Sequence, residues 1–183
     1  PWLAIYVGLS ATPLVVLYPL AKRVTWFPQF VLGLTFSWGV LLGWAAVAES
    51  LPPSSITLIY VGSVFWVFGY DTIYAIQDME DDRTVGIKSS ALAFNRRVRL
   101  GTGAAYAIAV GLIATGLFTL EHDGLPPVMF GWVGLAGMAI NLGMQIYKIR
   151  IDNAELALNL FKSNRNAGLF LIAGLMLDRL FTG

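Results

Sequence analysis

The stretch "SLPPSSITLIYVGSVFWVFGY", residues Ser50–Tyr70, contains no charged side chain. As an α-helix it would rise about 30 Å, which matches the hydrocarbon core of a lipid bilayer. Backbone N–H and C=O groups find no water inside a bilayer, and a helix satisfies them within the segment itself. The stretch therefore predicts a transmembrane α-helix, and it sets the fold class of the chain around it.

Apolar runs of the same kind occur along the rest of the chain. Four of them are about 20 residues or longer, enough to cross a bilayer: Trp2–Ala21, Val24–Ala48, Leu100–Leu120 and Gly124–Tyr147. Asn166–Leu177 is shorter, and we interpret it as a weaker span. Only 13% of the 183 residues are charged, against roughly 25% in soluble domains. We therefore expect an all-α, polytopic transmembrane helix bundle with six spans in this chain.

Basic residues are distributed unevenly among the predicted loops. Eleven of the twelve Lys and Arg side chains follow the first, third and fifth spans, and the loops after the second and fourth spans contain none. Positively charged loops remain on the cytoplasmic side, so the segment after Tyr70 lies at the inner interface. The net charge of +1 gives no reason to expect nucleic-acid binding, and the absence of cysteine excludes disulfides and thiolate chemistry.

Five of the eleven acids follow the Ser50–Tyr70 run within twelve positions, in "DTIYAIQDMEDD". If the helix continues past Tyr70, then Asp71, Asp78 and Asp82 lie on one of its faces. Aligned carboxylates repel one another and are costly beside hydrocarbon, so we expect a counter-charge next to them.

Asp78 and Asp82 form a DxxxD pair, which is suited to a divalent cation. Carboxylate oxygens are good ligands for Mg²⁺, which proteins usually hold through one or two carboxylates together with substrate phosphates. Lys88 follows closely enough to contact such a diphosphate as a point charge. Two simpler interpretations stay open on these residues alone. One is a solvated acidic loop, and the other is neutralisation of the acids by Arg83 and Lys88.

Two further segments, "YPLAKR" at Tyr18–Arg23 and "FKSNRNAG" at Phe161–Gly168, lie at the same inner level. The first brings Lys22 and Arg23 to the interface, either as part of a site or as ordinary positive-inside residues whose charges reach the headgroups. The second brings Asn164 to the same side. Taken alone, Asn164 is equally well explained as a helix cap.

These segments together resemble the UbiA superfamily of intramembrane prenyltransferases. The match is carried by "YDTIYAIQDMEDDRTVGIKSSAL", "YPLAKRVTWFPQFVLGLTFSWGVLLGWAAV" and "FKSNRNAGL", and it covers essentially the whole chain. The first of these is similar to the superfamily's second Asp-rich motif, YDxxYAxxDxxxD followed by GIKS. Within the superfamily, the chain most resembles the enzymes of ubiquinone biosynthesis that transfer a polyprenyl group from polyprenyl diphosphate to 4-hydroxybenzoate.

The resemblance implies roles for individual residues. It implies that Asp78 and Asp82 hold Mg²⁺, and that Asp71 and Arg23 also take part in catalysis. It implies substrate contacts for six residues: Tyr18, Lys22, Arg23, Tyr74, Lys88 and Asn164. Among these, Arg23 is expected to pair with the benzoate carboxylate, because its planar guanidinium matches that shape.

The superfamily fold, as the resemblance implies it, has nine transmembrane helices around a central cavity and two Asp-rich motifs. The first of these motifs, of the form NDxxDxxxD, has no match in this sequence. We therefore interpret residues 1–183 as a single transmembrane prenyltransferase domain that corresponds to the last six of nine spans, lacks the N-terminal three, and is inactive by itself. We expect an integral protein of a bacterial inner membrane or of the mitochondrial inner membrane.

Two other functions stay open. The same chemistry on another aromatic acceptor would use the same acids. A membrane transporter would use the aligned acids to bind a transported cation, but it predicts acids at the bilayer midplane and broken helices. The orientation of the spans instead places Asp78 and Asp82 at the interface, which favours prenyl transfer.

Overall fold

The computed structural model describes residues 2–182, and all of their side chains except those of residues 121 and 182. Helices account for most of this range: α1 Trp2–Ser10, α2 Thr12–Val24, α3 Pro28–Ala48, α4 Ser54–Tyr74, α5 Met79–Val85, α6 Ser90–Phe94, α7 Val98–Thr119, α8 Met129–Lys148 and α9 Ala154–Thr182. Two 3₁₀ turns, Asn95–Arg97 and Glu121–Asp123, flank α7. Within the described residues there is no β-strand, which confirms the predicted all-α class.

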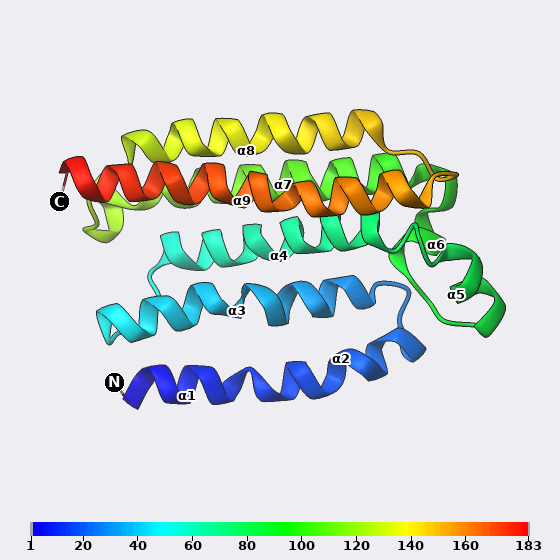
Figure 1. Ribbon diagram of the computed structural model, residues 1–183. Helices are drawn as coiled ribbons and strands as arrows, with labels where there is room; N and C mark the ends of the chain where they lie inside the picture. The colour runs from blue at the N-terminus through cyan, green and yellow to red at the C-terminus, as the bar shows by residue number, and fades with distance from the viewer. Residues whose placement is uncertain (1, 183) are drawn as a thin grey trace.

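The long helices lie side by side in one bundle (Figure 1). The pair α1–α2 packs on α3, α3 packs on α4, α4 packs on α7, and α8 packs on α9. The short helices α5 and α6 lie at the end of the bundle that the basic loops predict to face inward, which we call the inner end. The opposite, outer end carries the α3–α4 and α7–α8 connections.

Five helical segments are long and apolar enough to cross a membrane: Trp2–Val24, Pro28–Ala48, Ser54–Tyr74, Ser90–Thr119 and Met129–Lys148. These correspond to the first five predicted spans, and they identify the chain as an integral membrane protein. The sixth predicted run, Asn166–Leu177, lies inside α9. That helix has 29 residues but carries charged side chains along its length, which set it apart from the other five.

The helix that begins at Ser54 does not continue straight into the acidic stretch, in contrast to the continuous helix expected from the sequence. α4 ends at Tyr74, and the chain makes a tighter turn in which Ile76 N–H and Gln77 N–H donate to carbonyls three residues back. α5 then begins at Met79. The side chains at positions 75, 76 and 79 are buried in the core, and the turn keeps these apolar groups inside the protein.

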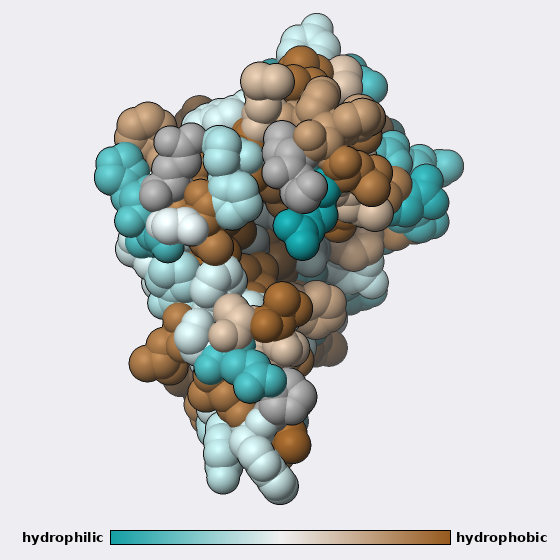
Figure 2. Space-filling view, turned by 90° about the vertical axis from the view of Figure 1, so that its left-hand side faces the viewer, coloured by the Kyte–Doolittle hydropathy of each residue, from teal (hydrophilic) through white to brown (hydrophobic). Residues whose placement is uncertain are grey.

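At the outer end, carboxylates from distant segments cap two helices. Ser55 N–H, in the first turn of α4, donates to Asp123 at 2.7 Å, and hydrogen bonds from Ser55 and Ser54 lower the pKa of that carboxyl. Phe130 N–H and Gly131 N–H, in the first turn of α8, donate to Asp178 at 2.8 and 2.6 Å. These bonds satisfy helix-terminal N–H groups that have no partner within the helix. Figure 2 looks onto this end and shows hydrophilic residues interspersed with apolar ones.

A buried polar network joins α4, α7, α8 and α9 in the interior of the bundle. Gln145 accepts from the Tyr106 hydroxyl at 2.7 Å and from the Asn164 amide at 3.2 Å, and its own amide donates to Ser163 at 3.0 Å. Asn164 in turn accepts from the Trp66 indole at 2.9 Å. Hydrogen bonds of this kind fix helices against each other where water is scarce.

Replacing Gln145 with Leu is expected to lower the stability of the protein in detergent by about 1–3 kcal/mol, because the Tyr106 hydroxyl and the Asn164 amide would lose a buried partner. A thermal unfolding series would measure the change. Thr115→Val is a suitable control, since the Thr115 hydroxyl bonds only to the carbonyl of Gly111 in its own helix. Equal effects of the two substitutions would contradict a stabilising role for the network.

Close packing of α8 on α9 depends on glycines. A Cβ at Gly134 would collide with the carbonyl oxygen of Phe170, and one at Gly174 with that of Phe130. Gly143, on the same helix as Gly134, faces open space.

Gly134→Ala is therefore expected to destabilise the protein by about 1–3 kcal/mol through overpacking. Gly143→Ala should be neutral or slightly stabilising, because Ala favours a helix by up to about 1 kcal/mol. Melting temperatures measured side by side should fall for Gly134→Ala and stay unchanged or rise slightly for Gly143→Ala.

Candidate active site

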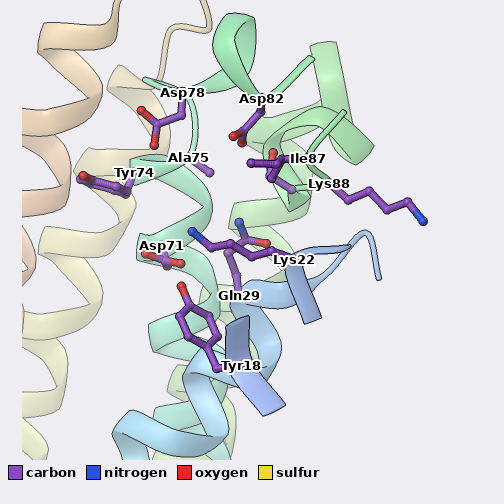
Figure 3. A pocket seen from close by; sticks show the side chains of 11 residues that line it. Tyr18, Lys22, Gln29, Asp71, Tyr74, Ala75, Asp78, Asp82, Ile87 and Lys88 are labelled. Atoms are coloured by element: carbon purple, nitrogen blue, oxygen red, sulfur yellow. The ribbon is translucent and has the colours of Figure 1, made fainter. Parts of the chain in front are cut away.

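Seven of the predicted site residues line one pocket at the inner end of the bundle (Figure 3). They come from three separate segments of the chain: Tyr18, Lys22, Asp71, Tyr74, Asp78, Asp82 and Lys88. The sequence brings them together because α2 and α4 both end at this level, and because α5 turns back over the pocket. The predicted gathering of acids and cations is thus present in the structure.

Each of the three carboxylates has its own backbone setting. Asp71 lies in the last turn of α4 and is half-buried, Asp78 immediately precedes α5, and Asp82 lies in the middle of α5. The bend between α4 and α5 therefore does not scatter them, and all three line the pocket. The acids lie at and beyond the end of a membrane-spanning helix. A prenyl-transfer site predicts acids at this position, whereas a transport site predicts them at the bilayer midplane.

The turn that follows α5 depends on Gly86. This residue adopts a left-handed conformation with φ of 73°, which a residue without Cβ adopts at low cost, and it ends the helix. Ile87 N–H then donates to the Asp82 carbonyl at 2.9 Å. The "GIKSS" segment thereby folds back along the pocket.

Polar contacts attach the "GIKSS" segment to the surrounding helices. Lys88 N–H donates to the Lys22 carbonyl at 3.2 Å, and Ser90 N–H donates to the Gln29 side chain at 3.0 Å. The Ser90 hydroxyl lies 2.7 Å from that of Thr72 on α4. Through these bonds the segment joins the end of α2 to the start of α3 and to α4, and it holds the pocket walls together.

Gln29 is a pocket residue that the sequence analysis did not identify. It is buried in the first turn of α3, lines the pocket, and accepts the bond from Ser90 N–H. The available signal was a polar side chain in the first turn of an apolar span, at the inner level of the predicted site. Such a residue has to satisfy its amide inside the protein.

Lys22 and Tyr18 approach the acids from α2. Figure 3 shows the Lys22 ammonium directed into the pocket near Asp71, with the Tyr18 hydroxyl close to the same carboxylate. The two residues are one helical turn apart, and the Lys22 ammonium lies 5.7 Å from the Tyr18 ring centroid. This is the counter-charge that the aligned acids led us to expect.

Lys88 lines the same pocket, but its ammonium is directed away from the three carboxylates (Figure 3). It donates instead to the Val24 carbonyl at 3.1 Å. The same ammonium lies 5.7 Å from the ring centroid of Trp26. In this structure Lys88 therefore fastens the α2–α3 connection, and Lys22 is the lysine that faces the acids.

Two other predicted site residues lie outside the pocket lining. Arg23 is exposed at the end of α2, one residue after Lys22. Asn164 is buried in the polar network, and its position well inside α9 contradicts the alternative that it caps a helix. A row of rings connects its surroundings to the pocket: Phe161 lies 5.6 Å from Tyr70 and 4.8 Å from Tyr74, measured between ring centroids.

The electrostatic setting of Asp82 favours a bound cation. Burial of the carboxyl and the nearby charge of Asp78 raise its pKa above the ordinary value of 3.8. A carboxyl whose pKa is raised on folding stabilises the folded chain at low pH, and this contribution is lost as the pH rises through the folded pKa. A cation held between the acids would offset the cost of the ionised form.

The donor chemistry of the pocket fits Mg²⁺. Among the described residues, no group of three or more His, Cys, Asp or Glu side chains is arranged to hold a metal ion by itself. Mg²⁺, however, is commonly bound through one or two carboxylates, with substrate phosphates and water completing its shell. Asp78 and Asp82 provide two hard oxygen donors at the pocket, so the residues present suit an ion that arrives with a phosphorylated substrate.

Comparison with known proteins places this geometry in a family. Residues 1–171 match the model of the UbiA prenyltransferase family. Curated relatives named 4-hydroxybenzoate polyprenyltransferase, mitochondrial, include those of Aedes aegypti, 41% identical over 100% of this chain, and Rattus norvegicus, 40% identical over 97% of it. The apo structure of a UbiA homologue from Aeropyrum pernix K1 aligns with a TM-score of 0.72 and 23% identity over 95% of the chain.

The chain therefore belongs to the UbiA prenyltransferase family. It spans 40% of the Aedes aegypti relative, 46% of the Rattus norvegicus relative and 63% of the Aeropyrum pernix chain. The similarity to the Aeropyrum pernix structure shows that the helices are arranged in the UbiA fold. The pocket built by α2, α4 and α5 is thus part of a prenyltransferase-family bundle.

Proposed function

We propose that the complete protein transfers a polyprenyl group from polyprenyl diphosphate to the 3-position of 4-hydroxybenzoate, a step of ubiquinone biosynthesis in a mitochondrial or bacterial inner membrane. The observation that carries this proposal is the pocket in which Asp71, Asp78 and Asp82 face Lys22 at the inner end of an apolar bundle. Such a pocket offers hard oxygen donors to a divalent cation and a lysine ammonium to a diphosphate, and the apolar bundle beside it suits a polyprenyl tail. The names of the curated relatives support this acceptor.

In this proposal Asp78 and Asp82 hold Mg²⁺, which when bound supplies positive charge to the diphosphate leaving group as a Lewis acid. Lys22 adds positive charge where negative charge develops as the allylic carbon–oxygen bond breaks and its electron pair leaves with the diphosphate. Tyr18 lines the same pocket, within reach of a diphosphate bound there. Asp71 keeps the Lys22 ammonium directed into the pocket.

The ring carbon ortho to the phenolic hydroxyl of 4-hydroxybenzoate then bonds to the allylic cation, and loss of the proton on that carbon restores aromaticity. Tyr74, part of whose ring is exposed at the pocket and which packs on Phe161, offers its aromatic face to the cation. Water has to be kept from the allylic cation, because it would otherwise capture it.

Arg23 is proposed to bind the carboxylate of the acceptor. It follows Lys22 directly and is exposed, so its long side chain is available for a bidentate bond to a carboxylate. Arg23→Gln is expected to raise KM for 4-hydroxybenzoate about tenfold or more while changing KM for the diphosphate little. Steady-state kinetics with each substrate varied separately would test this, and equal changes in both KM values would contradict it.

Prenyl transfer in membranes that carry the complete protein is the direct test of the proposed function. Labelled 4-hydroxybenzoate and a polyprenyl diphosphate would be supplied with Mg²⁺ or with a chelator. Prenylated 4-hydroxybenzoate should form only with Mg²⁺. Product with a different aromatic acceptor alone would keep the reaction class and overturn the acceptor, and no transfer to any acceptor would overturn the proposed function.

A further inference from the structure

A second charged pocket lies at the inner end of the bundle, apart from the candidate active site. We call it the basic pocket, and it is lined by six residues: Arg99, Tyr147, Lys148, Ile149, Arg150 and Leu156. Three of the six are cations, and no carboxylate lines it. The two acids nearest in sequence, Asp152 on the α8–α9 connection and Glu155 in the first turn of α9, are exposed and are not among the lining residues.

The cations of the basic pocket are held by ordered backbone. α8 ends at Lys148, and Ile149 is buried with its N–H donating to the Gln145 carbonyl at 3.0 Å. The backbone of Lys148 and of Arg150, on either side of Ile149, is therefore fixed beside the basic pocket. On the neighbouring helix, the Arg99 guanidinium lies 5.6 Å from the ring centroid of Tyr147, which is within the range of a cation–π contact.

Apolar side chains continue from the basic pocket along the membrane-facing side of α8. Ile140, Met144 and Tyr147 are exposed at positions that repeat along one face of the helix. Leu100, next to Arg99, is also exposed. The polar lining thus lies at the level of the phospholipid headgroups, with apolar surface below it at the level of the acyl chains.

We propose that the basic pocket binds the headgroup of an anionic phospholipid. Basic pockets between transmembrane helices at the cytoplasmic or matrix surface are suited to such headgroups. Lys148, Arg150 and Arg99 would surround the phosphate, and the acyl chains would lie along α8. Three cations without a lining carboxylate favour a lipid with net negative charge over a zwitterionic one. This proposal does not depend on the prenyl transfer proposed above.

Native mass spectrometry of the complete protein would test the proposal, with phosphatidylglycerol and phosphatidylcholine titrated separately. We expect retention of phosphatidylglycerol over phosphatidylcholine. Lys148→Gln/Arg150→Gln should lower phosphatidylglycerol retention about tenfold or more, since each basic side chain near the surface contributes appreciably to binding an anionic lipid. Arg96→Gln/Arg97→Gln is the matched control, because it removes the same amount of charge from the turn before α7, at the same inner end of the bundle but outside the pocket lining.

Each other outcome would overturn the proposal. Equal retention of the two lipids by the unmodified protein would show no anionic-lipid site, whatever the stability of the variants. Equal losses of phosphatidylglycerol retention in the two double variants would show that retention depends on the general positive charge of the inner surface and not on the basic pocket. Displacement of phosphatidylglycerol by millimolar inorganic phosphate would assign the pocket to free phosphate. Melting temperatures of both variants would confirm that each is folded before its lipid retention is compared.

Discussion

Asp78→Asn and Asp82→Asn are each expected to lower kcat for prenyl transfer by the complete protein about 10²–10³-fold, the usual cost of removing a main electrostatic stabiliser. Asn keeps the size of the side chain and removes the charge that holds the cation. Both carboxylates line the pocket, where their charge is available to a cation. Single-turnover assays with labelled 4-hydroxybenzoate at saturating Mg²⁺ would measure the effect.

Glu80→Gln is the control for these substitutions. Glu80 lies in the same short helix, is exposed, and is not among the residues that line the pocket. It should retain near-normal turnover. If Asp78→Asn and Asp82→Asn also retained near-normal turnover, the assignment of these carboxylates to Mg²⁺ would be wrong.

Lys22→Met is expected to reduce turnover about 10²-fold, because it removes the one lysine ammonium that faces the pocket acids in the described structure. Lys88→Met is the comparison variant, since the Lys88 ammonium bonds to the Val24 carbonyl and points away from the pocket acids. We expect it to reduce turnover much less and to lower the melting temperature slightly. Turnover and thermal unfolding measured on the same two preparations would separate the roles.

The outcome for Lys88 also discriminates between two descriptions of the site. A loss with Lys88→Met as large as that with Lys22→Met, at unchanged melting temperature, would mean that Lys88 turns into the pocket when a diphosphate is present. A small loss would establish Lys88 as the residue that fastens the α2–α3 connection.

The helical class and the first five spans could be predicted from composition because a bilayer imposes the same requirement on every backbone group it contains. The gathering of Asp71, Asp78 and Asp82 was predicted for a partly wrong reason. A continuous helix was assumed, whereas the chain turns after Tyr74 and resumes at Met79. The acids still meet, since the turn and the short helix α5 both fold over the same pocket.

Features that rest on contacts between distant segments were beyond sequence reasoning. Gln29 lines the pocket because Ser90, 61 residues later, donates to it. The direction of the Lys88 side chain depends on where the α2–α3 connection lies. Asn164 looked like a site residue or a cap, yet its amide is engaged by Gln145 and Trp66 from two other helices. Pattern and spacing describe neighbours along the chain, and these partners are neighbours only after folding.

The acid caps at the outer end have a consequence for how the protein is made. The first turn of α4 receives its cap from Asp123, and the first turn of α8 receives its cap from Asp178. During translation, each of these helices is synthesised long before the residue that caps it. α4 therefore enters the bilayer with N–H groups that stay hydrated at the surface until the α7–α8 connection has been synthesised. Translation of the last turns of α9 then completes α8, so each of these two helices is completed by a residue that is synthesised after it.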